Sequence, residues 1–335
     1  MTKPRAVLSG EINLETIALN DQLVCVNALG GSLIYSAAGY SIWEDNAGLH
    51  SITSSEVSDE QILKLRTEGF NSDGILRADD SLHAKQFILI KNEKIDFVSS
   101  PIEWFLNHKI PLPRTLLGYS PRFSSKEQNG ENVFGSFKAE RLIPPSFLGS
   151  KSLLVNLHGT QEYLRLVTAL NYPQIRIIVL YQTFFQQVNK NFLQLYLQGD
   201  QCVVFHKDSL QTLEKYDVKL GDPERAMIFL QNFGCEHLFL IAQDRVYFSS
   251  RKESKQLEIL RYPVFIKNRI NEQSAFAGGM LAGLAKGCMV DESALMGIVS
   301  MSIVNQLLPV QAKPEFLTEL PHARLEWLKT NSTYL

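Results

Sequence analysis

The chain has few cysteines and no excess of charge of either sign. Only 4 of its 335 residues are cysteine, and Cys25, Cys202, Cys235 and Cys288 lie too far apart for a Cys-x-x-Cys spacing. This distribution argues against a zinc site and against a disulfide framework. With 33 Lys and Arg against 35 Asp and Glu, the formal net charge is −2. The chain therefore lacks the basic footprint of a protein that binds nucleic acid or an anionic membrane.

Long apolar runs are also missing. Residues 22–43 and 293–312 carry no charge, but glycine, serine, asparagine or glutamine interrupts both stretches. A membrane-spanning helix needs roughly 20 predominantly apolar residues, so we interpret both stretches as buried segments. The apolar run at residues 6–8 is too short for the core of a signal peptide, and we expect a cytoplasmic protein.

Hydrophobic residues make up 45% of the sequence, which is enough for a sizeable core. Short apolar runs, such as residues 152–157 and 237–241, alternate with longer amphipathic stretches. This alternation predicts an α/β protein with a mostly parallel sheet and helices on both faces. Residues 101–149 contain several prolines and a polar segment, and we expect loops there.

Common catalytic motifs are absent from the sequence. It contains no G-x-x-x-x-G-K-[ST], G-x-G-x-x-G or G-x-S-x-G. His158 follows a predicted buried strand and is a candidate site residue, although a histidine at a strand end is more often structural. The acidic pair Asp79-Asp80 fits a turn better than a catalytic site. The spacing Gly279-x-x-x-Gly283 indicates close helix packing, because glycine within a helix otherwise costs about 1 kcal/mol relative to alanine.

Four segments of the chain form an ordered set. They read GEINLE at 10–15, LGGS at 29–32 with YSAA at 35–38, LRTEGFNSDGI at 65–75, and AFAGGMLAGL at 275–284. In this order they resemble the PfkB carbohydrate kinase family, and the last segment is the most specific match. The resemblance implies a ribokinase-like, doubly wound α/β fold. It also implies a single domain over residues 1–335, with a small β lid from about residues 11–29 and 84–112.

Members of this family transfer the γ-phosphoryl group of ATP to a hydroxyl of a sugar or nucleoside. The resemblance therefore implies ATP and Mg²⁺ as cofactors, and a small sugar or nucleoside as partner instead of nucleic acid or a membrane. It places sugar-binding residues at Glu15, Gly30, Gly31 and Tyr35, and it suggests that two chains pair through the lid. In the family, a Gly-Ala-Gly-Asp sequence at the start of the signature helix supplies the catalytic base and the amides that hold the phosphate.

This chain departs from the family pattern at that helix. The four positions before Ala275 read Asn271-Glu272-Gln273-Ser274. Ser274 stands at the base position, yet a hydroxyl does not ionise usefully near neutral pH, and Glu272 puts a carboxylate where a phosphate would bind. Loss of a general base alone typically costs about 10²–10⁴-fold in rate. We therefore predict a degenerate family member, weak or inactive as a kinase, that binds a ligand or regulates; Ser274 would still serve as the helix N-cap.

Two more departures from the family pattern agree with this prediction. Residues 242–245 read Ala-Gln-Asp-Arg and lack the glycine of the family's Thr/Ser-x-Gly turn. Residues 206–209 read His-Lys-Asp-Ser in place of the usual acidic and asparagine residues.

Two other interpretations of the sequence stay open. The chain could be an active sugar kinase whose base has moved to Asp208, Asp244 or Glu272. It could also be an unrelated α/β enzyme or binding protein.

Overall fold

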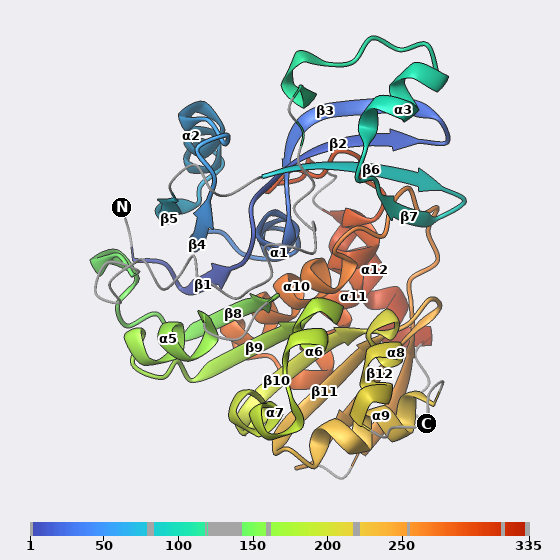
Figure 1. Cartoon of the computed structure of the whole chain (residues 1–335). Helices are drawn as coiled ribbons and strands as arrows, with labels where there is room; N and C mark the ends of the chain where they lie inside the picture. Colours follow the sequence, from blue (N-terminus) through green and yellow to red (C-terminus); the bar gives the residue numbers. More distant parts are fainter. Residues whose placement is uncertain are drawn as a thin grey trace.

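A computed structural model describes residues 3–78, 84–117, 119, 143–158, 162–216, 222–252, 255–315 and 319–331. It contains a nine-stranded sheet and a separate four-stranded sheet (Figure 1). The order of the large sheet is β13-β12-β11-β10-β9-β8-β1-β4-β5. Its strands are β1 Ala6–Ser9, β4 Ala47–Thr53, β5 Asn71–Arg77, β8 Ser152–Leu157, β9 Ile175–Leu180, β10 Gly199–His206, β11 Cys235–Ile241, β12 Arg245–Ser250 and β13 Lys255–Leu260.

The large sheet is mostly parallel, as the sequence predicts. Neighbouring strands from β5 to β11 pair in parallel, whereas β12 and β13 add an antiparallel edge. Side chains of each central strand alternate between two cores: Ala6 and Leu8 of β1 face one, and Val7 faces the other. Burial on both faces explains why these strands are continuous apolar runs.

Helices cover both faces of the large sheet (Figure 1). One face packs against α1 Ser32–Ser41, α10 Glu272–Lys286, α11 Val290–Val304 and α12 Glu319–Asn331. The other packs against α5 Glu162–Ala169, α6 Gln182–Gln187, α7 Lys190–Leu197, α8 Leu210–Leu213 and α9 Pro223–Gln231. Helix α2, Asp59–Thr67, follows the N-cap Ser58, which forms a capping box with Gln61.

Glycines let α10 lie very close to its neighbours. A Cβ on Gly278 would come within 2.1 Å of the Ser36 carbonyl oxygen of α1, and one on Gly279 within 2.2 Å of the Ser300 hydroxyl of α11. Gly283 meets Ser293 of α11 in the same way. The packing interpretation of Gly279-x-x-x-Gly283 is confirmed. This close packing fixes the N-terminus of α10 beside the carboxyl ends of the parallel strands.

The small sheet consists of β3 Gln22–Gly30, β2 Asn13–Leu19, β6 Lys85–Lys91 and β7 Lys94–Phe97, in that order. Strands β2 and β6 are parallel and the other two pairs antiparallel. One face contributes Ile17 and Ile88 to the core below α1. The other face is covered by α3, Pro101–Asn107, whose Trp104 and Phe105 pack on Phe87.

Several sequence expectations need correction. The loop expected over residues 101–149 begins with helix α3, because Pro101 is a favourable first helical residue and two aromatic side chains find a buried face; residues 118 and 120–142 lie outside the described part. The sequence pattern predicts a helix over residues 292–308, whereas helix α11 begins at Val290 and ends at Val304. Strands β5 and β13 and helices α7 and α12 were not expected at all.

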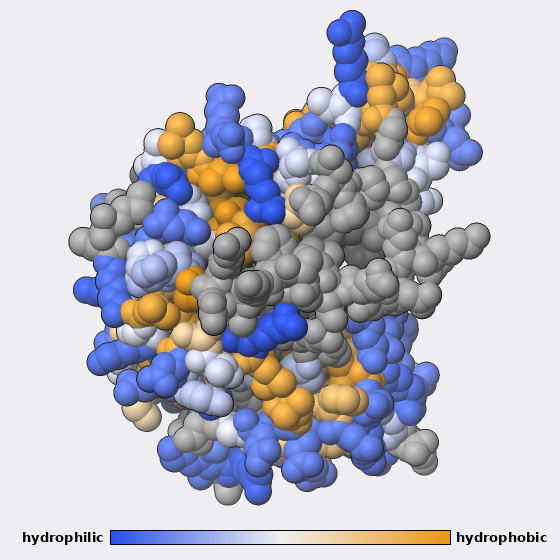
Figure 2. Space-filling model, turned by 60° about the vertical axis from the view of Figure 1, so that its left-hand side comes forward, coloured by the Kyte–Doolittle hydropathy of each residue, from blue (hydrophilic) through white to orange (hydrophobic). Residues whose placement is uncertain are grey.

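Two properties of the whole molecule bear on its class. All four cysteines are free thiols. In the described part of the chain, no helix combines the length and the apolar character needed to cross a lipid bilayer. Hydrophobic residues on the face shown in Figure 2 occur in separate groups among hydrophilic ones.

Candidate functional site

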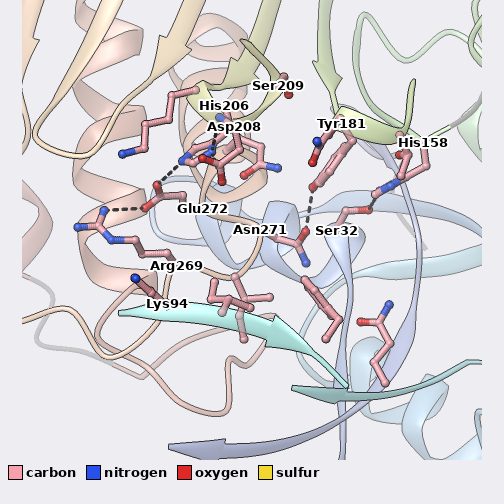
Figure 3. A pocket seen from close by; sticks show the side chains of 18 of the residues that line it. Ser32, Lys94, His158, Tyr181, His206, Asp208, Ser209, Arg269, Asn271 and Glu272 are labelled. Carbon is pink, nitrogen blue, oxygen red and sulfur yellow. Dashed lines mark hydrogen bonds and ion pairs between the residues drawn. The ribbon is translucent and has the colours of Figure 1, made fainter. Parts of the chain in front are cut away.

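A cavity of about 1100 Å³ lies between the small sheet and the carboxyl ends of the parallel strands (Figure 3). His158 follows β8, Tyr181 follows β9, and His206 ends β10, so three neighbouring strands each contribute a wall residue. Ile95 and Phe97 of β7 line the side formed by the small sheet. Ligands of open parallel sheets bind at this edge, so the fold itself marks the cavity as the candidate site.

The predicted base position, Ser274, is fully buried at the start of α10. Its hydroxyl donates to the Asn156 side-chain oxygen at 2.8 Å and also contacts the Tyr181 hydroxyl. Tyr181 in turn donates to the Asn271 side-chain oxygen at 3.1 Å. Both sides of the Ser274 hydroxyl are therefore engaged, and the Tyr181 ring stands between this hydroxyl and the cavity wall formed by His158.

Ser274 is not the helix N-cap, contrary to the sequence expectation. The N-cap is Asn271, whose φ of 49° is left-handed, and the helix begins at Glu272. Asparagine is one of the few residues other than glycine that adopt this conformation readily. This backbone requirement explains why asparagine can stand where the resembling family has glycine.

Glu272 is the most heavily bonded carboxylate of the site. It is fully buried, and it accepts hydrogen bonds from Arg261 at 2.7 and 3.2 Å, from Asn305 at 2.9 Å and from His206 at 3.1 Å. Arg269 adds a longer contact of 3.5 Å. Burial alone would raise the pKa of this carboxyl, but the hydrogen bond from His206 and the charge of Arg261 outweigh burial and hold the pKa well below its usual range. Glu272 is therefore charged and neutralises cations supplied by its own chain.

His206 joins this network to the cavity. Its Nε2 lies 3.1 Å from Glu272, and its Nδ1 lies 3.1 Å from the carboxylate of Asp208. Burial would lower the pKa of the His206 imidazole, but hydrogen bonds to Asp208 and Glu272 outweigh it and raise the pKa to about 9. The imidazolium between two carboxylates continues the network from Arg261 to the cavity surface.

The raised pKa of His206 predicts a pH dependence of stability. In the unfolded chain a histidine titrates near about 6.5, so the stabilisation is fully present below that pH and is lost as the pH rises through 9. We expect the free energy of unfolding, measured with urea, to fall between pH 6.5 and 9. His206→Gln should remove most of this fall, whereas His108→Gln, in the segment after α3, should keep it. An equal fall in all three proteins would contradict the prediction.

The predicted sugar-binding residues come together, but beside the cavity instead of on its wall. Glu15 is 2% exposed, and its carboxylate accepts hydrogen bonds from the Gly31 amide at 2.8 Å and from the Tyr35 hydroxyl at 3.3 Å. A Cβ on Gly30 would overlap this carboxylate. Burial raises the pKa of Glu15 to about 7, although both hydrogen bonds lower it. Among the described residues that line the cavity, none of these four occurs, and their role in sugar binding stays a prediction.

The cavity wall contains residues that the sequence did not single out. Glu11, within the GEINLE segment, lies with its Oε2 3.7 Å from His158 Nε2. His158, a candidate from the sequence, stacks on Tyr181 at 3.8 Å between ring centroids and lies 3.4 Å from the Ser32 hydroxyl. Tyr181 could have been found, because it directly follows a predicted strand. No local pattern marks Arg269, which also lines the cavity.

The other acidic candidates differ in whether they lie on the cavity wall. Asp208 lines the cavity with a mostly exposed carboxylate, and its hydrogen bond with His206 lowers its pKa. Asp244 instead pairs with Arg245 at 2.8 Å and is not among the described wall residues. Asp79-Asp80 lies outside the described residues. Of the described candidates for a relocated base, Asp208 therefore combines a mostly exposed carboxylate with a place on the cavity wall.

The residues at the start of α10 do not fit a transferring phosphate group. A phosphate would need cations or backbone amides that are available to it. Here the carboxylate of Glu272 already neutralises Arg261 and His206 and is itself buried. A second anion placed beside it would meet like charge in a medium of low polarity. We therefore derive no step through ATP or Mg²⁺ from this geometry.

No family model matches the chain, and no curated protein matches its sequence. Solved structures do match it over nearly its whole length. A ribokinase from Thermotoga maritima is 16% identical, with 96% of this chain and 99% of that chain covered and a TM-score of 0.67. A putative ribokinase II from E. coli in complex with ATP and Mg²⁺ is 12% identical, with 98% and 100% covered and a TM-score of 0.65.

A pyrophosphate-dependent kinase of the ribokinase family, complexed with a pyrophosphate analogue and myo-inositol, is also similar. It is 11% identical, with 95% of this chain and 99% of that chain covered and a TM-score of 0.63. At such identities the likeness establishes the fold. The chain has the ribokinase-like α/β fold, with a large mostly parallel sheet and a second small sheet, and the fold class implied by the resemblance is confirmed.

Proposed function

We propose that this chain is a ribokinase-fold protein that binds a sugar or nucleoside in the cavity and has weak or no kinase activity. The observation that carries the proposal is the buried Glu272 carboxylate at the N-terminus of α10, held by Arg261 and His206. The fold keeps a ligand cavity under the small sheet, while the position for the phosphate holds an anion of the chain itself. In this proposal, the protein senses a ligand or regulates a partner.

The base position supports the same proposal. The Ser274 hydroxyl is bound to Asn156 and covered by Tyr181, so it can neither ionise nor reach a ligand hydroxyl. Absence of a general base costs about 10²–10⁴-fold, and each lost oxyanion donor about 10²–10³-fold. Even without full additivity, either loss alone makes phosphoryl transfer slow.

The remaining features of the proposal follow the family resemblance. Residues 1–335 form one domain with the small sheet as its lid, and the protein acts in the cytoplasm. ATP and Mg²⁺ bind weakly or not at all. Pairing of two chains through the lid would use an edge strand, because the face of the small sheet that points away from the large sheet is covered by α3.

Calorimetry tests the loss of nucleotide binding. We expect titration with Mg·ATP to give no measurable heat of binding, because the cations at α10 are already neutralised. A melting screen with sugars and nucleosides should reveal ligands, since a ligand at 100 times its Kd stabilises the fold by about 2.7 kcal/mol. His158→Ala should abolish such a shift, and Glu258→Gln, far from the cavity wall, should retain it. Micromolar affinity for Mg·ATP would refute the proposal.

An active sugar kinase with a relocated base is the second candidate. The observation that favours it is the exposed carboxylate of Asp208 on the cavity wall. Its lowered pKa makes it a weak base, and the fully bonded Glu272 is a weaker one. A coupled assay for ADP across pentoses, hexoses and nucleosides decides between the candidates. Steady ADP production that Asp208→Asn abolishes would support this alternative.

A further inference from the structure

Arg269 connects three parts of the molecule at the mouth of the cavity. Its guanidinium lies 3.0 Å from the carboxylate of Glu93 in the small sheet and 3.5 Å from Glu272 at the start of α10. It also donates to the Gln243 carbonyl oxygen, at 3.4 Å, in the turn between β11 and β12. Arg269 is thus the described side chain through which the small sheet is ion-paired to the network around Glu272, and Figure 3 shows Arg269 beside Glu272 at the cavity.

Glu93 occupies an unusual backbone position. Asn92 and Glu93 form the two-residue turn between β6 and β7, with φ values of 50° and 62°. Turns of this kind favour Asn-Gly, because a side chain at positive φ is strained. A glutamate in the second position therefore indicates that its side chain has a role that offsets the backbone strain. The ion pair with Arg269 is the contact that this side chain makes.

The other two-residue turn of the small sheet gives a direct comparison. Asn20 and Asp21, between β2 and β3, have φ values of 46° and 66°. Asp21 also forms an ion pair, but with Lys91, at 3.0 Å and within the same sheet. The two acids are similarly exposed, at 49% and 51%. They differ in that only the Glu93 pair crosses from the small sheet to the body of the molecule.

We propose that the Glu93–Arg269 ion pair is a latch that holds the small sheet closed over the cavity, and that Glu272 keeps Arg269 in position for it. Asn92, Glu93 and Lys94 all line the cavity, so the latch sits on the path by which the small sheet would swing away. The chain joins the small sheet to the body at Ile12, Gly31 and Ala84, and Lys85 at the start of β6 also pairs with Glu56 of the body at 2.7 Å. The turn at Glu93 lies at the opposite end of β6 from these connections, where an ion pair can control opening.

Reagent access to His158 measures the latch directly. His158 lines the cavity and its side chain is 23% exposed, so its modification by diethyl pyrocarbonate reports how often the cavity opens. His322, exposed on α12, serves as the reference within each molecule. Glu93→Gly removes the carboxylate and relieves the strained turn. We expect the ratio of His158 to His322 modification to rise about two- to fivefold, the range for a partly exposed ion pair.

Three further proteins make the test decisive. Arg269→Gln should raise the ratio as Glu93→Gly does, and the double variant should show no further rise, because both changes break one interaction. Asp21→Gly makes the same backbone change and removes the ion pair within the sheet, so its ratio should stay at the wild-type value. An unchanged ratio in Glu93→Gly, or an equal rise in Asp21→Gly, would overturn the latch. Because no ligand is added, this result is independent of the proposed function.

Discussion

Replacement of Glu272 by glutamine is expected to lower the free energy of unfolding by about 3–5 kcal/mol, the usual cost of breaking a buried ion pair from one side. The glutamine has the shape of glutamate but lacks the charge. Arg261 and His206 are 8% and 17% exposed in their side chains, so water replaces the lost anion only in part. The amide NH₂ group also meets donors of Arg261 or Asn305 where the carboxylate presented acceptors.

Urea unfolding at pH 7 measures this effect. The matched control is Glu258→Gln, which removes the carboxylate of an equally close pair with Arg245, at 2.5 Å, on the protein surface. Both groups of that pair are more than a third exposed, so the control should change stability far less. A loss for Glu272→Gln no larger than that of the control would mean that the network does not stabilise the fold.

The central strands of the large sheet could be predicted from the sequence, because each of them is a recognisable apolar run. Strands β1, β8 and β11 are buried on both faces, so their apolar runs stand out. Strand β5 begins Asn-Ser-Asp-Gly and has no such run, although it pairs with β4 at the edge of the sheet. In the small sheet, the pattern predicts a hairpin of residues 87–90 and 95–98, which β6 and β7 confirm, whereas β2 and β3 were expected only through the family resemblance. Tertiary pairing, not local pattern, decides such strands.

For the site, the sequence predicted a role for residues 271–274 and a conflict between Glu272 and a phosphate. Both stay predictions, although the structure places Asn271, Glu272 and Gln273 on the cavity wall. It could not identify the partners, because His206 and Asn305 lie 66 and 33 residues from Glu272 along the chain. The N-cap was misplaced for a related reason: Ser274 has the right side chain, but the left-handed backbone at Asn271 starts the helix earlier and Asn156 takes the serine hydroxyl.

Introducing the sequence of the resembling family at α10 is expected to produce the largest functional change. The variant carries Asn271→Gly, Glu272→Ala, Gln273→Gly and Ser274→Asp. Removal of the Glu272 carboxylate leaves Arg261, His206 and Arg269 with one negative charge fewer, so a phosphate can take its place. Glycine also accepts the left-handed φ of 49° at position 271. We expect measurable binding of Mg·ATP by calorimetry, tighter than that of the unchanged chain by at least about tenfold, or 1.4 kcal/mol.

The catalytic part of this prediction depends on position 274. An aspartate there lies between Asn156 and the Tyr181 hydroxyl, so the tyrosine must turn aside before a ligand hydroxyl can reach the carboxylate. The control carries the same first three changes with Ser274→Asn, which offers the anion site without a base. With a sugar or nucleoside found in the melting screen, ADP production should be about 10²–10⁴-fold faster for the aspartate variant than for the asparagine control.

Stability must be kept apart from activity in this experiment. Both four-residue variants lose the buried carboxylate and should unfold more easily, but inorganic phosphate should restore part of the stability by occupying the vacated position. The two variants share this loss, so a difference in ADP production between them reports the base alone. If both bind Mg·ATP and neither produces ADP, the Tyr181 ring keeps the base from the ligand, and Tyr181→Ala, which removes the ring, should then release activity in the aspartate variant. If neither variant binds Mg·ATP, the carboxylate of Glu272 is not what excludes the nucleotide, and the proposed reason for lost kinase activity is wrong.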